Sequence, residues 1–544
     1  MNLIPTPHRR MFLARAGGVL TLPLLARAAV RPLQEGGLVT GQAEAAAAGN
    51  AVLAAGGNAV DAIVVAALVA GVVALPSTGI GGYGGHLVGA KPGGKPFAID
   101  FNTTAPAAAK ADMFHADEQG RVEGNAHLHG WLSAGVPGVL AGLQLALDKH
   151  GTKPFAEVAK PAIKYARDGF KVTKGVAASI KAARPRFVKD AGSAKLFLKN
   201  GEPLAEGELF RNPDLAALLE TLAAKGRVDD FYTGKTAEKI AAAFKANGGL
   251  VSVPDLGAYR AVEVEPVSLE WRGFTMFTPH PTAGGLTSLQ ALSTLKALVW
   301  EKFDPKEPTT AQAKVEALRI AWTDRFHFLG DPKFVDVPIQ KLLSVKMAEQ
   351  SAQRVRTAIE KKKPVEGSSD GRSAGGTIHL TAVDSSGFTV ALTFTHGENF
   401  GAQVTVDGLG LVLGHGVSRF DPRPNRANSI APGKRPLHNM CQTVVMKDGN
   451  PVLALGATGG RRIPNTVFDV LAYRIGAGLP LAEAVKSPRL HTDGDPVVTL
   501  EAAWPAAVGE HLKAIGYTVK TGGAANLNAI ERDAKTGELT AAAR

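Results

Sequence analysis

The stretch Gly375-Gly376-Thr377-Ile378-His379-Leu380-Thr381-Ala382-Val383-Asp384 begins at the end of a polar run, residues 361–376, that opens with three lysines and is then rich in glycine and serine. Two glycines precede Thr377, and the residues after it alternate between apolar and polar, which is typical of a strand. A threonine that opens a strand is usually a structural residue. The preceding run has the composition of a mobile, cleavable segment. Our hypothesis, which the motifs described below have to support, is that the chain cuts itself between Gly376 and Thr377. Thr377 would then be an N-terminal nucleophile.

The chemistry of an N-terminal threonine explains why such a cut would be needed. A threonine hydroxyl is a weak nucleophile without a base. A free α-amino group supplies that base, because its ordinary pKa of about 7.7–8.0 lies close to working pH. Glycines before Thr377 permit a tight turn, in which the hydroxyl can approach the Gly376 carbonyl for an N-to-O acyl shift.

The composition is that of a globular protein. Of the 544 residues, 45% are hydrophobic and 20% are charged, which excludes extensive disorder. The one cysteine, Cys441, excludes an internal disulfide and a cysteine-rich zinc site; we expect it to be a small buried residue. No cluster has metal-ligand spacing, so we predict neither a metal nor another cofactor.

The net charge of +12 does not predict nucleic-acid binding. Four of the positive charges, Arg9, Arg10, Arg15 and Arg27, lie in the first 28 residues, so a mature chain without them would carry 12 − 4 = +8. The remaining Lys and Arg are scattered among acids, and no basic stripe is interleaved with aromatics. A modest preference for anionic substrates remains compatible with this charge.

The N-terminal residues 1–28 have the pattern of an export signal. His8-Arg9-Arg10-Met11-Phe12-Leu13 resembles a twin-arginine motif, and the apolar run 16–26 that follows is too short to span a bilayer. Ala26-Arg27-Ala28 resembles a signal-peptidase site. We therefore predict a periplasmic or secreted mature protein with no membrane span. A basic amphipathic start to a helix is the alternative.

The N-terminal third predicts buried helices and a glycine-rich turn. Residues 41–56 have helical spacing, Asn58 is suited to cap the next helix, and 62–75 are almost wholly apolar, as in a helix buried on all sides. Residues 79–84 match G-x-G-x-x-G, but a helix precedes them and strands follow, so a dinucleotide site is rejected. These glycines would rather let the backbone pass close to another segment, for example the active site.

The rest of the chain divides into helical and strand blocks. Residues 129–260 are mostly helical, and 262–278 return to strand character with a turn at Trp271-Arg272-Gly273. The further expected elements are helices from Leu286 onwards, at 309–329 and at 338–360, and strands at 377–383, 388–395, 442–447 and 451–455. Strands in two separated blocks predict a layered α/β sandwich.

Several motifs occur in the order found in one known family. They are Gly56-Gly57-Asn58-Ala59-Val60-Asp61-Ala62, Gly79-Ile80-Gly81-Gly82, Phe101 to Pro106, Gly135-Val136-Pro137-Gly138, Asp324-Arg325, Leu329-Gly330-Asp331-Pro332, Gly375 to Leu380, Pro432-Gly433-Lys434-Arg435-Pro436-Leu437 and Gly459-Gly460-Arg461-Arg462-Ile463. From about residue 38 to 500 the chain resembles the γ-glutamyltransferase family. The resemblance implies an N-terminal-nucleophile hydrolase with an αββα sandwich, made as one precursor. Its large (29–376) and small (377–544) subunits would stay together.

The resemblance also implies catalytic roles. Gly459 and Gly460 match the family's oxyanion pair, although a glycine turn between strand 451–456 and the next helix would look the same. Thr395 matches a second threonine that hydrogen-bonds the nucleophile, and an ordinary strand threonine is the alternative. His379 lies on the same strand face as Thr377, but we expect a core histidine satisfied by hydrogen bonds.

The residues that would read a γ-glutamyl group differ from the family pattern. Asn102 stands where an arginine binds the α-carboxylate, and Gly416 and Arg419 stand where the α-amino group is bound. Gly397 replaces a family asparagine, with Asn399 close by, and His438-Asn439 replaces a serine pair. The candidate substrate-binding residues are Asn102, Asn399, Arg419, His438, Asn439 and Arg461.

These features predict a self-processing amidohydrolase of the γ-glutamyltransferase type that cleaves γ-glutamyl or related amides of small molecules through an acyl-enzyme. One alternative is an acylase or amidohydrolase of the same family whose acidic, non-glutamyl acyl group meets Arg419, Arg461 or His438. Another is an unprocessed, inactive binding homologue. Whether water or an amine accepts the acyl group stays open.

Overall fold

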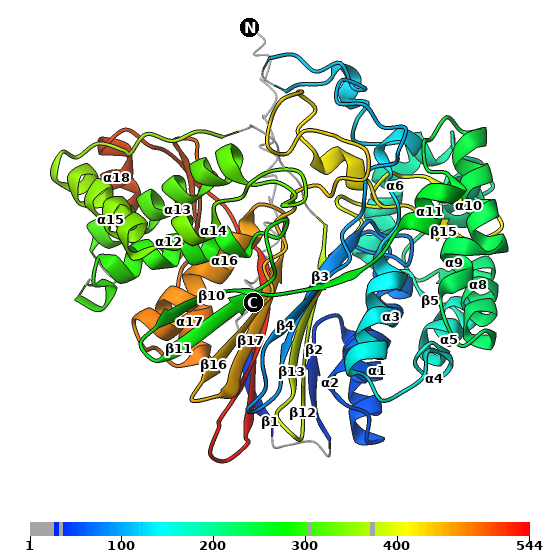
Figure 1. Ribbon diagram of the computed structural model, residues 1–544, viewed down its shortest axis with the longest axis horizontal. Helices are drawn as coiled ribbons and strands as arrows, with labels where there is room; N and C mark the ends of the chain where they lie inside the picture. Colours follow the sequence, from blue (N-terminus) through cyan, green and yellow to red (C-terminus); the bar gives the residue numbers. More distant parts are fainter. Residues whose placement is uncertain (1–26, 32–35, 119, 303, 305–306, 370–375) are drawn as a thin grey trace, which may run out of the picture.

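The computed structural model describes residues 27–31, 36–118, 120–302, 304, 307–369 and 376–544 (Figure 1). The predicted twin-arginine motif and the apolar run after it lie outside the described residues, as do residues 370–375 of the predicted cleavable run. Two stacked sheets form the centre of the molecule, with one group of helices on each outer side (Figure 1).

Both central sheets are antiparallel. The seven-stranded sheet has the order β1 (Arg27–Arg31), β22 (Leu539–Ala543), β21 (Asn526–Arg532), β17 (Asn450–Thr458), β16 (Thr443–Lys447), β11 (Phe274–Thr278) and β10 (Val267–Trp271). The six-stranded sheet has the order β2 (Gly37–Thr40), β12 (Ile378–Asp384), β13 (Thr389–Thr395), β3 (Gly84–Ala90), β4 (Phe97–Asp100) and β9 (Val262–Val264). The strand that follows Thr377 is therefore flanked on both sides.

Helices cover the outer face of each sheet. Those beside the six-stranded sheet include α1 (Ala43–Ala54), α2 (Ala59–Val73), α3 (Val139–His150), α5 (Lys160–Asp168) and α8 (Pro213–Ala224) (Figure 1). Those beside the seven-stranded sheet include α12 (Gly285–Ala297), α13 (Pro308–Phe328), α15 (Val345–Glu360) and α16 (Arg462–Leu471) (Figure 1). The predicted four-layer αββα sandwich is confirmed.

Smaller elements complete the helical layers. The remaining α-helices are α4 (Phe155–Val158), α6 (Lys174–Phe187), α7 (Ala191–Phe197), α9 (Asp229–Thr233), α10 (Lys235–Ala246), α11 (Val253–Ala258), α14 (Ile339–Leu342), α17 (Leu481–Lys486) and α18 (Ala506–Ala514). Short strand pairs are β5 (Phe170–Lys171) with β8 (Leu209–Phe210), β6 (Leu198–Lys199) with β7 (Glu202–Pro203), and β14 (Thr405–Val406) with β15 (Leu411–Val412). A three-stranded sheet joins β18 (Leu490–His491), β19 (Val497–Leu500) and β20 (Thr518–Thr521).

Most of the sequence-based elements are confirmed. All fifteen residues of α2 are buried, and Asn58 caps it in a reciprocal capping box with Asp61. The expected helix 338–360 is wrong in one respect, because it breaks into α14 and α15. The Ser344 hydroxyl accepts a hydrogen bond from the Met347 N–H and so starts α15 as a separate helix.

The edges of the two sheets are formed by strand pairings that the sequence analysis did not predict. The segment 262–278 is divided between the two sheets, because β9 pairs with β4 while β10 and β11 join the other sheet. β1 and the strands after residue 490 were not foreseen. Arg27 and Ala28 of the predicted signal segment belong to β1, which pairs with β22, and removal of residues 1–28 stays a prediction.

The two sheets approach each other closely beside the strand that follows Thr377. Val88, Ala90 and Ala391 from one sheet pack against Val444, Met446 and Ala454 from the other in an apolar cluster. A Cβ placed on Gly456 of β17 would lie 2.3 Å from Cε1 of His379 on β12. The glycine is therefore required where the His379 ring fills the space between the sheets.

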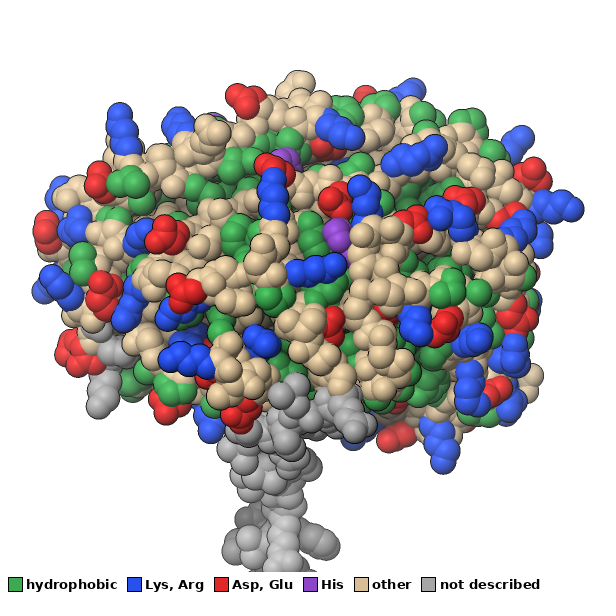
Figure 2. Space-filling view, turned by 60° about the horizontal axis from the view of Figure 1, so that its bottom comes forward, with side chains coloured by type: hydrophobic (Ala, Val, Ile, Leu, Met, Phe, Trp, Pro, Cys, Tyr) green, Lys and Arg blue, Asp and Glu red, His purple; other side chains and the backbone are tan. Residues whose placement is uncertain are grey.

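The surface carries charges of both signs. On the face shown in Figure 2, Lys and Arg side chains are interspersed with Asp and Glu, and no broad field of one sign is present. Among the described residues, no helix is long and apolar enough to cross a membrane.

A buried ion pair joins two helices that flank the candidate site. Nζ of Lys314 on α13 lies 2.5 Å from Oδ1 of Asp469 on α16, and both side chains are fully buried. The Lys314 ammonium also donates to the Tyr473 hydroxyl at 3.2 Å. α16 starts at Arg462, two residues after Gly460, so this pair fixes the helix that follows the predicted oxyanion turn.

We predict that Lys314→Met lowers the free energy of unfolding by about 3–5 kcal/mol, because it leaves the Asp469 carboxylate buried and unpaired. Denaturant unfolding followed by circular dichroism measures the change. The double variant Lys314→Met with Asp469→Leu is the control, and it should recover most of the loss. Equal unfolding midpoints for Lys314→Met and the unmodified chain would contradict the assignment.

Candidate active site

Thr377 and Thr395 are placed side by side by the pairing of β12 with β13. The register joins Ile378 to Phe394, so the next pair outward is Thr377 and Thr395. Their Oγ1 atoms lie 3.4 Å apart, and Thr377 is only 7% exposed. The predicted nucleophile therefore lies at the buried end of a central strand and not on a free loop.

The carbonyl oxygen of Gly376 lies between the two hydroxyl groups. It is 2.5 Å from Oγ1 of Thr377 and 2.5 Å from Oγ1 of Thr395. The Thr395 oxygen accepts a hydrogen bond from the Gly397 N–H at 2.7 Å, so its own proton is directed to the Gly376 carbonyl. Thr395 thus polarises the peptide bond that is predicted to break.

Gly376 and Gly397 pack against each other in conformations that favour glycine. Their φ angles are +109° and +105°. A Cβ on Gly376 would lie 3.3 Å from the Gly397 carbonyl oxygen, and a Cβ on Gly397 would lie 2.1 Å from Nε2 of His415. The backbone conformation favours glycine at both positions, and at Gly397 the space requires it as well.

The glycine-rich turn 79–84 packs against the same point. A Cβ on Gly82 would lie 2.9 Å from the Thr395 carbonyl oxygen, and one on Gly79 would lie 2.5 Å from the His396 ring. The prediction that these glycines allow a close backbone approach is confirmed, and the segment they approach is the end of β13.

Arg419 is oriented by a neutral histidine. Nδ1 of His415 donates to the Leu128 carbonyl at 2.8 Å, and Nε2 accepts from Nη2 of Arg419 at 3.1 Å. Burial, reinforced by Arg419, holds the pKa of His415 well below its usual value. Arg419 also lies 3.9 Å from the carboxylate of Glu398. Because Glu398 directly follows Gly397, this cation is held close to the Gly376–Thr377 bond.

The predicted oxyanion pair forms the turn between β17 and α16. Gly459 and Gly460 have φ angles of +141° and +64°, which L-residues with side chains rarely adopt. The Gly460 carbonyl accepts from the Ile463 N–H at 3.1 Å, which begins the helix. The turn is therefore built for glycine, and the oxyanion role of its N–H groups stays a prediction.

A cavity of about 600 Å³ lies beside these elements. It brings together three of the predicted substrate residues, Arg419, Asn439 and Arg461. The charged Arg and Asp residues that line it are Arg121, Arg325, Arg419, Arg423, Arg426, Arg461 and Asp421. Among the residues that the structure describes, the lining is basic, although Arg423 is paired with Asp421, Arg461 with Asp493 and Arg121 with Asp117.

Arg461 and Arg325 form one wall of the cavity. Nη1 of Arg461 donates to Asp493 at 2.8 Å, and its guanidinium lies 5.1 Å from the Phe326 ring. Nη2 of Arg325 donates to the His438 carbonyl at 2.8 Å. Asp324-Arg325 was recognised in the sequence as a family motif, but the place of Arg325 in this wall was missed.

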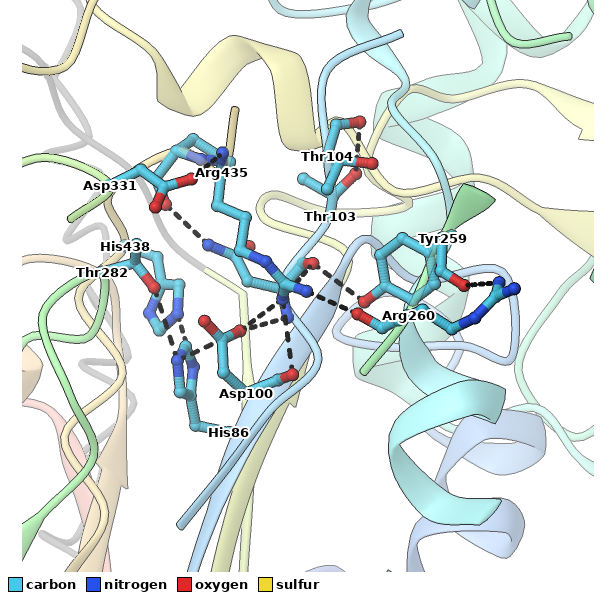
Figure 3. A network of polar contacts seen from close by, with 12 residues as sticks. His86, Asp100, Thr103, Thr104, Tyr259, Arg260, Thr282, Asp331, Arg435 and His438 are labelled. Atoms are coloured by element: carbon cyan, nitrogen blue, oxygen red, sulfur yellow. Dashed lines mark hydrogen bonds and ion pairs between the residues drawn. The ribbon is translucent and has the colours of Figure 1, made fainter. Parts of the chain in front are cut away.

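The other predicted substrate residues lie apart from the cavity lining. Asn102 and His438 are both buried: Nδ2 of Asn102 donates to the Pro436 carbonyl at 2.6 Å, and His438 contacts His86 (Figure 3). Asn399 is exposed, and its Nδ2 lies 3.4 Å from Oγ of Ser179.

His379 and Cys441 are core residues. His379 contacts the hydroxyls of Thr393 and Thr381 at 2.8 and 3.0 Å, and burial lowers its pKa to about 3. The expectation of a satisfied core histidine is confirmed. Burial raises the pKa of Cys441 to about 11, which makes it a poor nucleophile. Within the described ranges, no group of His, Cys, Asp and Glu side chains is arranged to hold a metal ion.

Comparisons with known proteins agree with this geometry. The sequence profile of the family described as Gamma-glutamyltranspeptidase matches residues 45–544. The glutathione hydrolase proenzyme of Escherichia coli (strain K12) is 37% identical over 443 residues, 78% of this chain and 76% of that protein. The acylase ACY 1 proenzyme of Pseudomonas sp. (strain SE83) is 35% identical over 490 residues, 88% and 86% of the two chains.

A solved structure shares nearly the whole fold. The cephalosporin acylase from Bacillus halodurans superimposes with a TM-score of 0.84 and 26% identity, over 98% of this chain and 97% of that chain. The sandwich and its relatives define a self-processing amidohydrolase of the N-terminal-nucleophile class. Within that class, this chain belongs to the gamma-glutamyltranspeptidase family.

We predict that Gly397→Ala lowers kcat/KM by about a hundredfold, because the new Cβ displaces the ring that orients Arg419 and shifts the backbone beside Gly376. Steady-state kinetics on the processed enzyme measure the change. Gly273→Ala is the matched control, since Gly273 has a φ of +75° but open space around its Cβ position. It should cost about 1–2 kcal/mol of stability and leave kcat/KM unchanged. Equal kinetics for the two variants would contradict the close approach.

Proposed function

We propose that Thr377 is the catalytic nucleophile, released when the precursor divides into residues 29–376 and 377–544. The observation that carries the proposal is the arrangement of two hydroxyls around the Gly376 carbonyl, each 2.5 Å from its oxygen. A strand threonine with a purely structural role would not need a second hydroxyl directed at the preceding carbonyl.

Self-cleavage follows as an acyl shift. Oγ1 of Thr377 attacks the Gly376 carbonyl carbon, and its proton passes to the nitrogen of Thr377 as the C–N bond breaks. The Thr395 hydroxyl stabilises the negative charge on the carbonyl oxygen during the attack. Water then hydrolyses the resulting ester, which leaves a carboxylate on Gly376 and a free α-amino group on Thr377.

The same hydroxyl then performs amide cleavage. The α-amino group accepts the proton of Oγ1 as this atom attacks the substrate carbonyl, and it returns the proton to the departing amine. The N–H groups of Gly459 and Gly460 stabilise the oxyanion. The acyl-threonine ester is then hydrolysed by water, or transferred to an acceptor amine.

The acyl group that fits the cavity is anionic. The arginine-lined wall places Arg419 and Arg461 where a carboxylate of the substrate can form charge-assisted hydrogen bonds. Asn439 adds an amide to the same wall. A dicarboxylic monoamide such as a glutaryl amide satisfies this wall without an ammonium group, which the arginines would repel.

A γ-glutamyl group is the second candidate. One observation favours it: Glu398 provides a carboxylate beside Arg419 that can pair with the α-ammonium of a glutamyl substrate. Glutathione hydrolase is the name of one relative and acylase that of another, so the family includes both kinds of protein.

The N-terminal pattern supports export. The arginine pair at Arg9-Arg10 and the short apolar run after it are those of a twin-arginine signal. We therefore place the mature enzyme in the periplasm or outside the cell, with residues 1–28 removed.

For processing, we predict that the purified protein shows two bands on a denaturing gel and that the smaller begins at Thr377 by N-terminal sequencing. Thr377→Ala should stay one band, because no hydroxyl can attack the Gly376 carbonyl. Thr395→Val should slow cleavage by about 10²–10³-fold, since it removes one oxyanion donor.

Thr389→Val is the control for processing. This threonine lies at the other end of β13 and is also buried, with its hydroxyl donating to the Gly387 carbonyl. Its cleavage rate should match that of the unmodified chain. A single band for the unmodified protein would favour the unprocessed, inactive homologue, and a smaller band that starts elsewhere would contradict Thr377.

For the substrate, we predict that the processed enzyme cleaves glutaryl p-nitroanilide with a higher kcat/KM than butyryl p-nitroanilide. Arg419→Met should reduce this ratio by about 10–100-fold, the loss of one hydrogen bond to a charged group. Release of p-nitroaniline measures both rates.

The remote variant Arg227→Met, which removes a surface pair with Asp148, should keep the ratio. A ratio near one in the unmodified enzyme would contradict the anionic acyl group. A clear preference for γ-glutamyl over glutaryl p-nitroanilide would establish the second candidate instead.

A further inference from the structure

Buried polar side chains from His438 through His86 and Asp100 to Arg435 form a chain of contacts (Figure 3). Nε2 of His438 lies 2.8 Å from Nδ1 of His86, and Nε2 of His86 lies 3.3 Å from Oδ1 of Asp100. Nη1 of Arg435 donates to the same carboxylate oxygen at 2.7 Å. All four side chains are buried, so every hydrogen bond that they form is shielded from competition by water.

The hydrogen bonds of the chain have one consistent direction. Nδ1 of His438 accepts from the Met440 N–H at 3.2 Å, so its proton is on Nε2 and is donated to His86. Nδ1 of His86 is then an acceptor, and its Nε2–H is directed to Asp100. Burial, together with His86 and Arg325, holds the pKa of His438 well below its usual value. The His438 ring is therefore neutral, and the hydrogen bonds of the chain assign one tautomer to each ring.

Asp100 holds both ends of the segment 435–438. Arg435 binds the carboxylate directly, and His438 reaches it through His86. Burial alone would raise the pKa of Asp100, but Arg435 and His86 hold it far below the usual range. At the same time, Asp331 accepts from the backbone N–H of Arg435 at 2.9 Å. The segment is thus attached to the end of β4 at two points.

The opposite side of His438 faces the cavity wall. Its carbonyl oxygen accepts from Nη2 of Arg325 at 2.8 Å, and Nη2 also lies 3.5 Å from Oδ1 of Asn439. Arg325 and Asn439 both line the cavity, whereas His86 and Asp100 do not. A displacement of the His438 ring would consequently move the acceptors that orient the Arg325 guanidinium.

We propose that His86 and His438 are positioning residues. They link the buried Asp100 to the backbone that Arg325 contacts, hold Arg325 and Asn439 in place, and thereby set the affinity for the anionic part of the substrate. The inference rests on the proposed hydrolysis of amides with an anionic acyl group. It assigns His438 an indirect role, in contrast to the direct contact with an acidic acyl group considered from the sequence.

The effect should appear in KM and not in the chemical step. His86→Leu removes both ring nitrogens and should raise KM for glutaryl p-nitroanilide by about tenfold or more, the loss of one oriented charged hydrogen bond. The kcat value should stay within about twofold, because neither the Thr377 hydroxyl nor Gly459–Gly460 belongs to the polar contacts between His438, His86 and Asp100. Self-cleavage should proceed at the normal rate for the same reason. His86→Gln, whose amide can accept from His438 and donate to Asp100, should restore most of the affinity.

A double-mutant cycle separates positioning from a structural role. Arg325→Met, His86→Leu and the combined variant are compared by KM, which does not depend on the fraction of folded enzyme. If His86 acts through Arg325, the combined variant has the KM of Arg325→Met alone. If His86→Leu gives no processed enzyme, His86→Asn, which is too short to span both partners, takes its place in the cycle.

Three results would overturn the inference: an unchanged KM in His86→Leu, additive effects of the two substitutions, or a His86→Gln variant as impaired as His86→Leu. Failure of the proposed function is read separately, from the glutaryl-to-butyryl ratio of the unmodified enzyme. In that case the double-mutant cycle is measured with the p-nitroanilide that the enzyme does cleave, and the same three results would overturn the positioning role.

Discussion

The antiparallel pairing of β12 with β13 is the constraint on which the site depends. It sets Thr377 opposite Thr395 and leaves the Gly376 carbonyl within 2.5 Å of both hydroxyls. Because β12 is flanked by β2 and β13 and packed on α2, the first residue of the strand has little freedom. A nucleophile held in this way needs no large movement to reach the bond before it, which is the requirement for intramolecular attack.

Close approach of backbones keeps this pairing compact. Gly82, Gly397 and Gly456 each lie where a Cβ would overlap a neighbouring segment. Gly82 lies against the end of β13 and Gly456 against His379 of β12, while Gly397 lies against the His415 ring. In a close-packed interior a single methyl group is not accommodated without displacement. The main role of these glycines is therefore to let neighbouring segments lie close together, and not to make the backbone flexible.

The electrostatics divide into two layers. The cavity carries six arginines with one aspartate among its described lining residues, while the buried network contains His86, His438 and the Asp100 carboxylate bound by Arg435. A buried charge without a partner is costly, which explains why Asp100 has Arg435 beside it. Protein acceptors hold the arginines of the cavity wall in place, as the His438 carbonyl does for Arg325 and the Asp493 carboxylate for Arg461.

The sequence by itself determined the layered α/β class, the capped and fully buried α2, and the position of Thr377 at a strand start after two glycines, because hydrophobic periodicity and glycine placement are local properties. It also identified Arg419, Asn439 and Arg461, which the cavity brings together. Only the tertiary structure decided that Arg325 joins their wall, that His438 turns away toward His86, and that the 262–278 segment divides between two sheets. These outcomes depend on contacts between residues far apart in the chain, and the direction of a side chain across such a contact is set by packing and hydrogen-bond satisfaction, which no local pattern encodes.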